Sequence, residues 1–134
     1  MHTTSRGVVT LFDRSFKSGT GSMALMGSGS IGGKAQGLAA MSDLLEHEIS
    51  QQFASVVRVN IPTLVVIGTD YFDLFLRQNN LHETAFSDSR DDLLGHAFQR
   101  TDLPPQLVGD LRALIAQSHA PLAVRSSRCS SMSR

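Results

Sequence analysis

The sequence has few of the features by which several protein classes are identified. It has one cysteine, Cys129, so no internal disulfide can form and a secreted disulfide scaffold is excluded. Its 12 basic and 12 acidic residues cancel, which leaves no electrostatic reason to expect a nucleic acid or an acidic membrane surface as a partner. The aromatic residues are Phe and a single Tyr, Tyr71, so no platform for stacking nucleic-acid bases is evident.

Long apolar runs are also missing. No run approaches the roughly 18–20 residues that span a bilayer, and the apolar block at residues 8–12 is too short for a secretory signal peptide. The length of 134 residues suggests one domain, which buries about two-thirds of its unfolded surface. We therefore expect a soluble, cytoplasmic protein without a membrane partner.

Patterns that mark metal sites and nucleophiles are lacking too. The five histidines show neither the H-x-x-H nor the H-E-x-x-H spacing of zinc sites, and Cys129 has no cysteine partner. No G-x-S-x-G elbow marks a serine nucleophile. We predict no metal ligand and no catalytic residue in this chain.

Glycine, in contrast, is concentrated in one segment. Seven of the 11 glycines lie between positions 19 and 37, although glycine costs backbone entropy unless a positive φ or a close approach requires it. Residues 28–34, SGSIGGK, have the form of a loop that binds phosphate with its N–H groups in front of a helix, and Lys34 adds a positive charge. The alternative is a flexible linker with a solvated Lys34, and the residues alone leave both open.

Two known nucleotide-binding motifs can be compared with this loop. The Walker motif fails, because Ser28 stands at its first glycine and Ala35 at its hydroxyl position. The dinucleotide fingerprint G-x-G-x-x-G matches at residues 27–32. However, residues 22–26 before it predict only a weak strand, and the next predicted strand ends in Asn60 instead of an acidic residue. Dinucleotide binding is therefore the less favoured hypothesis.

Hydrophobic periodicity and turn residues predict an α/β order of elements. We expect Thr69 to cap a helix that has Asp70 in its first turn, and a capping box from Ser89 to Asp92 to open another helix. The predicted elements are a helix at 33–50, strands at 56–60 and 64–67, a helix from Thr69 with Phe72, Phe75 and Leu76 in the core and its end at Asn79-Asn80, a helix from Ser89, a helix from Pro104-Pro105 and a strand at 122–124.

Four blocks of the sequence occur in an order that matches one known family. They are GGKAQGLAAM at 32–41, IPTLVVIGT with YFDLFL at 61–76, LPPQL at 103–107 and LAVRSS at 122–127. This set resembles the nucleotide-binding domain of pyruvate phosphate dikinase and phosphoenolpyruvate synthase. The corresponding family patterns are approximately G-G-K-x-x-x-L-x-x-M, V-P-x-G-F-x-[IV]-[ST] followed by F-x-x-F-L, L-P-x-x-L and [VL]-A-V-R-S-S. The glycine and phenylalanine of the second pattern are replaced here by Leu64 and Val65.

The resemblance implies a partial ATP-grasp-like subdomain, an α/β fold in which helices flank a mixed sheet. It also implies that Lys34 and Arg125 contact ATP phosphates, together with the loop residues Gly32 and Gly33. These roles suit a point charge at a glycine loop and a planar fork at a strand end. The implied organisation is an N-terminal extension with the Gly-rich loop (1–29), the nucleotide-binding part (30–127) and a Ser/Arg tail where the family sequence is cut off (128–134).

The reaction of the family's full-length members passes a phosphoryl group from ATP, with Mg²⁺, through an enzyme histidine to pyruvate. The family's Mg²⁺ ligands, phosphohistidine domain and barrel for pyruvate or phosphoenolpyruvate have no counterpart in this sequence. We therefore expect a fragment of an ATP-dependent phosphotransferase that is inactive by itself. The alternative is a stand-alone nucleotide-binding or regulatory module without catalysis.

Overall fold

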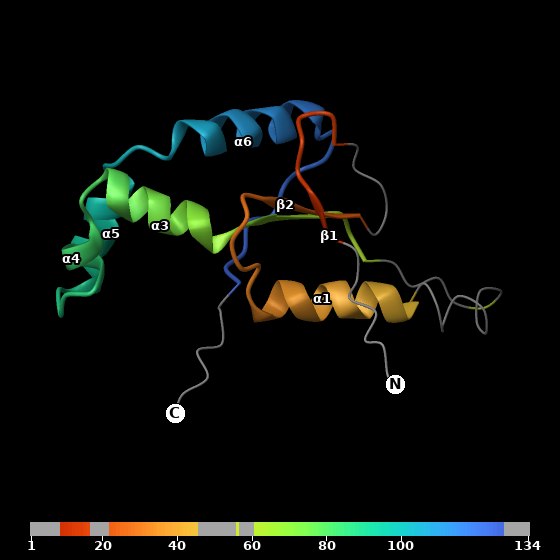
Figure 1. Ribbon diagram of the computed structural model, residues 1–134, viewed down its shortest axis with the longest axis horizontal. Helices are drawn as coiled ribbons and strands as arrows, with labels where there is room; N and C mark the ends of the chain where they lie inside the picture. The colour runs from red at the N-terminus through yellow and green to blue at the C-terminus, as the bar shows by residue number, and fades with distance from the viewer. Residues whose placement is uncertain (1–8, 17–21, 46–55, 57–60, 128–134) are drawn as a thin grey trace.

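The structure, a computed structural model, describes residues 9–16, 22–45, 56 and 61–127. These residues form a three-stranded sheet and five helices (Figure 1). The α/β class predicted from the sequence is confirmed. The elements are β1 (Val9–Leu11), β2 (Met23–Met26), α1 (Gly33–Leu44), β3 (Leu64–Ile67), α3 (Thr69–Gln78), α4 (His82–Ala85), α5 (Asp91–Gln99) and α6 (Pro105–Gln117). No helix within the described ranges combines the length and apolar character needed to cross a bilayer.

The sheet is parallel throughout the part of the chain that the structure describes. β2 lies in the centre, where Met23 pairs with Val9 of β1 on one side and with Leu64 of β3 on the other. The connection from β2 to β3 contains α1, and such a crossover lets the next strand start from the same end of the sheet. The mixed sheet expected from the family resemblance is therefore wrong for these residues.

Residues 22–26 were predicted to form only a weak strand, but β2 is the central strand of the sheet. Its residues, Met-Ala-Leu-Met, include no β-branched side chain and have modest strand propensity. In the structure neighbouring strands pair with both edges of β2, and Ala24 is 0% exposed and Met26 1% exposed. Burial in the centre of the sheet thus outweighs local propensity.

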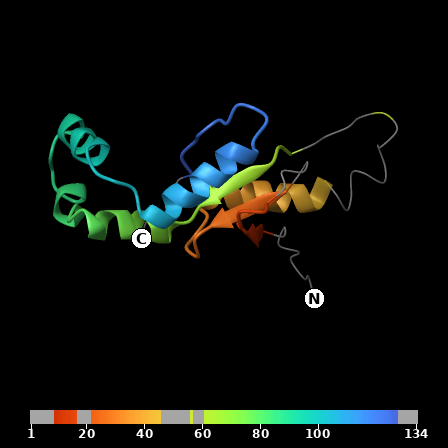
Figure 2. The ribbon, with the colours of Figure 1, turned by 90° about the horizontal axis from the view of Figure 1, so that it is seen from above.

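Helices cover both faces of the sheet (Figures 1 and 2). α1 lies along one face, with Ala35 and Ala39 buried. α6 lies over the other face, where Leu107 packs with Met26 of β2 and Tyr71 of α3 in one core cluster. α1 ends at Leu44, earlier than the predicted residue 50, and residues 46–50 lie outside the described part.

α3, α4 and α5 extend away from the sheet and enclose a second core (Figure 1). Its buried members are Phe75, Leu76 and Leu81, and the ring of Phe98 meets that of Phe75 edge-on at a centroid distance of 5.6 Å. Phe72 was predicted to be a core residue of α3, but it is 51% exposed.

The ends of α3 follow local signals in the sequence. The helix stops after Gln78, and Asn80 takes a left-handed φ of 53°, which asparagine tolerates better than most residues. Asp70 lies in the first turn as predicted. Thr69 is the first helical residue and Gly68 is the N-cap, so the predicted Thr69 cap is wrong by one position.

Several predicted features do not appear in the described residues. Ser89 does not cap α5, because the N-cap is Arg90 and the Ser89 hydroxyl bonds to that of Ser87. Residues 122–124 form no strand: they have no strand neighbour to pair with among these residues, and Val124 is 96% exposed. Of the strand expected at 56–60, the structure describes only Val56, which lies in a turn; residues 57–60 lie outside the described part.

Candidate functional site

The glycine-rich loop lies at the carboxyl end of the parallel sheet (Figure 1). It follows β2 and leads through Gly32 into α1. Next to it, β3 passes through Gly68 into α3. Ligands of open α/β sheets bind at this end, where strands lead into helices. The carboxyl edge of β2 and β3 is therefore the candidate site.

Two residues of the β3–α3 junction hold the loop in place. Oδ2 of Asp70 accepts the N–H of Ser28 at 2.9 Å, and Oδ1 accepts the N–H of Gly29 at 2.8 Å. The hydroxyl of Thr69 accepts the N–H of Ser30 at 2.9 Å, while the Thr69 N–H donates to the Ser30 carbonyl at 3.1 Å. Three successive amides of the loop are thus hydrogen-bonded within the protein.

The charge of Asp70 is set by these hydrogen bonds. Partial burial raises the pKa of its carboxyl, but the N–H groups of Ser28, Gly29 and Asp70 itself, with the Ser28 hydroxyl, outweigh that effect. The pKa of Asp70 therefore lies below its ordinary value of 3.8. At neutral pH the loop contains an internal anion.

Glycine is required at two points of the loop because the backbone there has positive φ. Gly27 has a φ of 91° and Gly32 a φ of 77°, values that residues with a Cβ rarely adopt. Gly32 also lies against the C-terminal segment, since a Cβ at this position would come within 2.6 Å of the Ser127 hydroxyl oxygen.

The predicted ATP ligands of the loop lie at the start of α1. Gly32 is the N-cap of this helix, and Gly33 and Lys34 are its first two residues, with Lys34 exposed. The N–H groups of Gly33 and Lys34 have no hydrogen-bond partner among the described residues, as is usual in the first turn of a helix. These amides are therefore available to a ligand.

The C-terminal segment brings the fourth predicted ligand, Arg125, towards the same place. The hydroxyl of Ser127 donates to the Ile31 carbonyl at 3.3 Å and accepts the Ala35 N–H at 3.4 Å, across 96 and 92 positions of the sequence. Arg125 is exposed and precedes Ser127 by two residues, so their α-carbons are at most about 7 Å apart. The segments that carry Lys34 and Arg125 meet at the start of α1.

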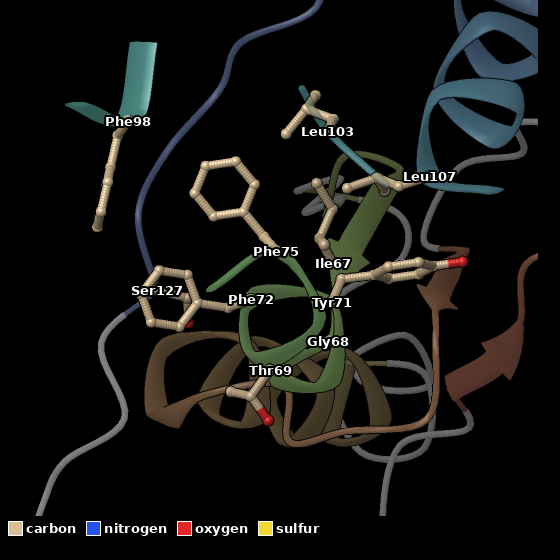
Figure 3. Close-up of a pocket in the computed structure, with 10 residues that line it drawn as sticks. All are labelled: Ile67, Gly68, Thr69, Tyr71, Phe72, Phe75, Phe98, Leu103, Leu107 and Ser127. Atoms are coloured by element: carbon tan, nitrogen blue, oxygen red, sulfur yellow. The ribbon is translucent and has the colours of Figure 1, made fainter. Parts of the chain in front are cut away.

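An open, mainly apolar cavity of about 520 Å³ adjoins this site (Figure 3). Thr69 and Ser127 belong both to the cavity wall and to the contacts described above. The lining residues are Ile67, Gly68, Thr69, Tyr71, Phe72, Phe75, Phe98, Leu103, Leu107 and Ser127.

The contact of Asp70 and Thr69 with the glycine loop was not predicted. Both residues were assigned to the start of a helix, which accounts for their position but not for their hydrogen-bond partners in the loop. The sequence signal was that both residues lie within three positions of the end of a predicted strand, since the carboxyl ends of parallel strands meet at one edge of a sheet. Within the described ranges, no group of three or more His, Cys, Asp or Glu side chains is placed to hold a metal ion.

Searches of protein families, of curated proteins and of solved structures find no match to the chain. The described residues form an α/β architecture with a three-stranded parallel sheet and five helices. The likeness to a family rests on the four sequence blocks alone.

Proposed function

We propose that this chain is the ATP-binding part of a phosphotransferase of the pyruvate phosphate dikinase and phosphoenolpyruvate synthase type. One observation above all supports the proposal. The two hydrogen bonds of Ser127 hold the segment of Arg125 against the start of α1, where Gly32, Gly33 and Lys34 lie. Two segments more than 90 positions apart in the sequence thereby meet at the start of α1.

The phosphates of ATP would bind at this point. The N–H groups of Gly33 and Lys34 and the positive end of the helix dipole attract an anion. Lys34 adds a point charge, and the planar guanidinium of Arg125 can bind two phosphate oxygens at once. Phosphoryl transfer depends mainly on positioning and on neutralising charge, which are the contributions that these groups can make.

Catalysis in this proposal belongs to a longer parent protein. There the phosphoryl group would pass from ATP through an enzyme histidine to pyruvate, and Mg²⁺ bound outside this chain would neutralise the phosphate charge. The 134-residue chain alone would bind ATP without transferring its phosphoryl group. A purified chain that is compact and binds ATP would also fit the alternative of a stand-alone binding module.

Dinucleotide binding is the second candidate, because one structural observation favours it. The G-x-G-x-x-G segment at 27–32 directly follows β2, a buried central strand, and leads into α1 as the fingerprint requires. A second observation argues against this candidate. In dinucleotide-binding folds the amides of this loop bind the pyrophosphate, but here the N–H groups of Ser28 and Gly29 already donate to the Asp70 carboxylate.

Calorimetric titration of the purified chain with ATP tests the first candidate. Lys34→Ala and Arg125→Ala should each weaken binding about tenfold or more, since a lost hydrogen bond to a charged group costs about 1.5–3 kcal/mol. Arg112→Ala, which removes an exposed arginine of α6, is the matched control and should leave the affinity unchanged. Unchanged affinity in both test variants would remove the site, and a preference for NAD over ATP would favour the second candidate.

A further inference from the structure

Asp70 makes the contacts in the glycine loop that a bound phosphate would make. Its two carboxylate oxygens accept the N–H groups of Ser28 and Gly29 at 2.9 and 2.8 Å, and the Ser28 hydroxyl lies 3.4 Å from Oδ2. Successive N–H groups in a loop that includes a positive-φ residue, here Gly27, form the concave sites in which proteins bind anions. In this protein the anion comes from the protein itself, 41–42 residues further along the chain.

The backbone around Asp70 is fitted closely to that carboxylate. A Cβ on Gly27 would lie 2.6 Å from Oδ1 of Asp70, and a Cβ on Gly68 would lie 2.5 Å from the same atom. A Cβ on Gly29 would lie 2.5 Å from the Asp70 amide nitrogen. Glycines from both junctions thus enclose the carboxylate, and a phosphate cannot reach the same amides while it is there.

We propose that Asp70 is an internal competitor that closes the N–H groups of Ser28 and Gly29 to phosphate and pyrophosphate groups, so that the loop is a latent anion site. The carboxylate is attached to the protein and competes at an effective concentration on the order of millimolar or more. It also repels a second anion. Removal of this one charge should therefore open the loop to an inorganic anion.

This inference goes beyond the proposed function, because it concerns amides that the ATP site at Gly33 and Lys34 does not use. It explains why a loop with the dinucleotide fingerprint at 27–32 has its central amides, those of Ser28 and Gly29, hydrogen-bonded to Asp70. The ligand class is a phosphate or pyrophosphate group, whichever nucleotide the rest of the site accepts.

The test is an NMR titration of the ¹⁵N-labelled full chain with inorganic pyrophosphate, without metal, that follows the amide signals of Ser28 and Gly29. In the wild type these signals should not respond. In Asp70→Ala they should shift and saturate at a pyrophosphate concentration at least tenfold below any effect in the wild type. Asp73→Asn removes an exposed carboxylate from the same helix and should behave as the wild type.

Asp70→Asn provides a second variant if Asp70→Ala does not fold. It keeps the shape of the side chain but loses the charge, and its NH₂ group cannot accept a hydrogen bond, so pyrophosphate should again shift the signal of at least one of the two amides. A response of these amides in the wild type would overturn the inference, as would folded Asp70 variants that do not respond. Failure of the proposed function would be seen separately, as an absence of ATP-induced shifts at Gly33 and Lys34 in the wild type.

Discussion

Replacing Gly32 by alanine perturbs the junction between the loop, α1 and the C-terminal segment at a single atom. Gly32 has φ 77° and ψ 158°, a region that is essentially restricted to glycine, and a non-glycine residue there costs about 1–3 kcal/mol. The new Cβ would also lie 2.6 Å from the Ser127 hydroxyl oxygen and 2.9 Å from the Ser127 carbonyl oxygen. We expect Gly32→Ala to lower the free energy of unfolding by about 1–3 kcal/mol and to displace Ser127.

Gly37→Ala is the matched control in the same helix. A Cβ at Gly37 meets nothing within 4 Å, and alanine is favoured over glycine in a helix interior by about 1 kcal/mol. Thermal unfolding followed by circular dichroism compares the two variants, at about 3–5 °C per kcal/mol for a chain of this size. Gly32→Ala should lower the Tm by several degrees, whereas Gly37→Ala should raise it.

ATP titration of the same two variants gives an independent measurement. A displaced Ser127 would carry Arg125 away from the start of α1, so Gly32→Ala should weaken ATP binding and Gly37→Ala should not. A Gly32→Ala protein that melts at or above the wild-type temperature would refute the reasoning. It would mean that the backbone at Gly32 does not have positive φ and that Ser127 does not pack against it.

Two further predictions concern stability. Leu76 is 1% exposed in the second core, so Leu76→Ala should lower the free energy of unfolding, measured with urea, by about 2–5 kcal/mol. Leu93→Ala, at a 59% exposed position of α5, should change this free energy by less than about 0.5 kcal/mol, and equal losses in the two variants would contradict the packing. The pKa of Asp70 is lower in the folded protein than its ordinary value, so its contribution to stability is present above about pH 4 and is lost as the pH falls through the folded pKa. Asp70→Asn should therefore reduce the loss of stability between pH 5 and pH 3, and an undiminished loss would show that Asp70 does not contribute.

Much of α3 and α6 could be predicted from the sequence. The β3 residues form a continuous apolar run, Asn79-Asn80 mark the end of α3, and Pro104-Pro105 mark the start of α6. Each of these signals acts between residues that are close in sequence, through backbone dihedral preference or the period of apolar side chains. Such preferences hold in any tertiary context that buries the apolar face.

Other features depended on partners that are distant in sequence. β2 has weak propensity and is a strand because β1 and β3 pair with both of its edges. Residues 122–124 were predicted to form a strand, but they have no strand neighbour among the described residues and are exposed. Strand formation requires a hydrogen-bonding neighbour, which a local pattern does not supply.

The candidate site shows the same division. The residue types of the site can be identified from the sequence: a dense group of glycines, a lysine at a helix start and an arginine near the C-terminal end of the chain. The assembly arises from the parallel sheet, which brings the loop after β2 beside the junction after β3 and so joins Asp70 to Gly29 over 41 positions. Ser127 reaches Ile31 over 96 positions by the same compaction of the chain. Local sequence preferences select helices and turns, but the geometry of the sheet selects which loops meet, because only packing determines which ends of the strands lie side by side.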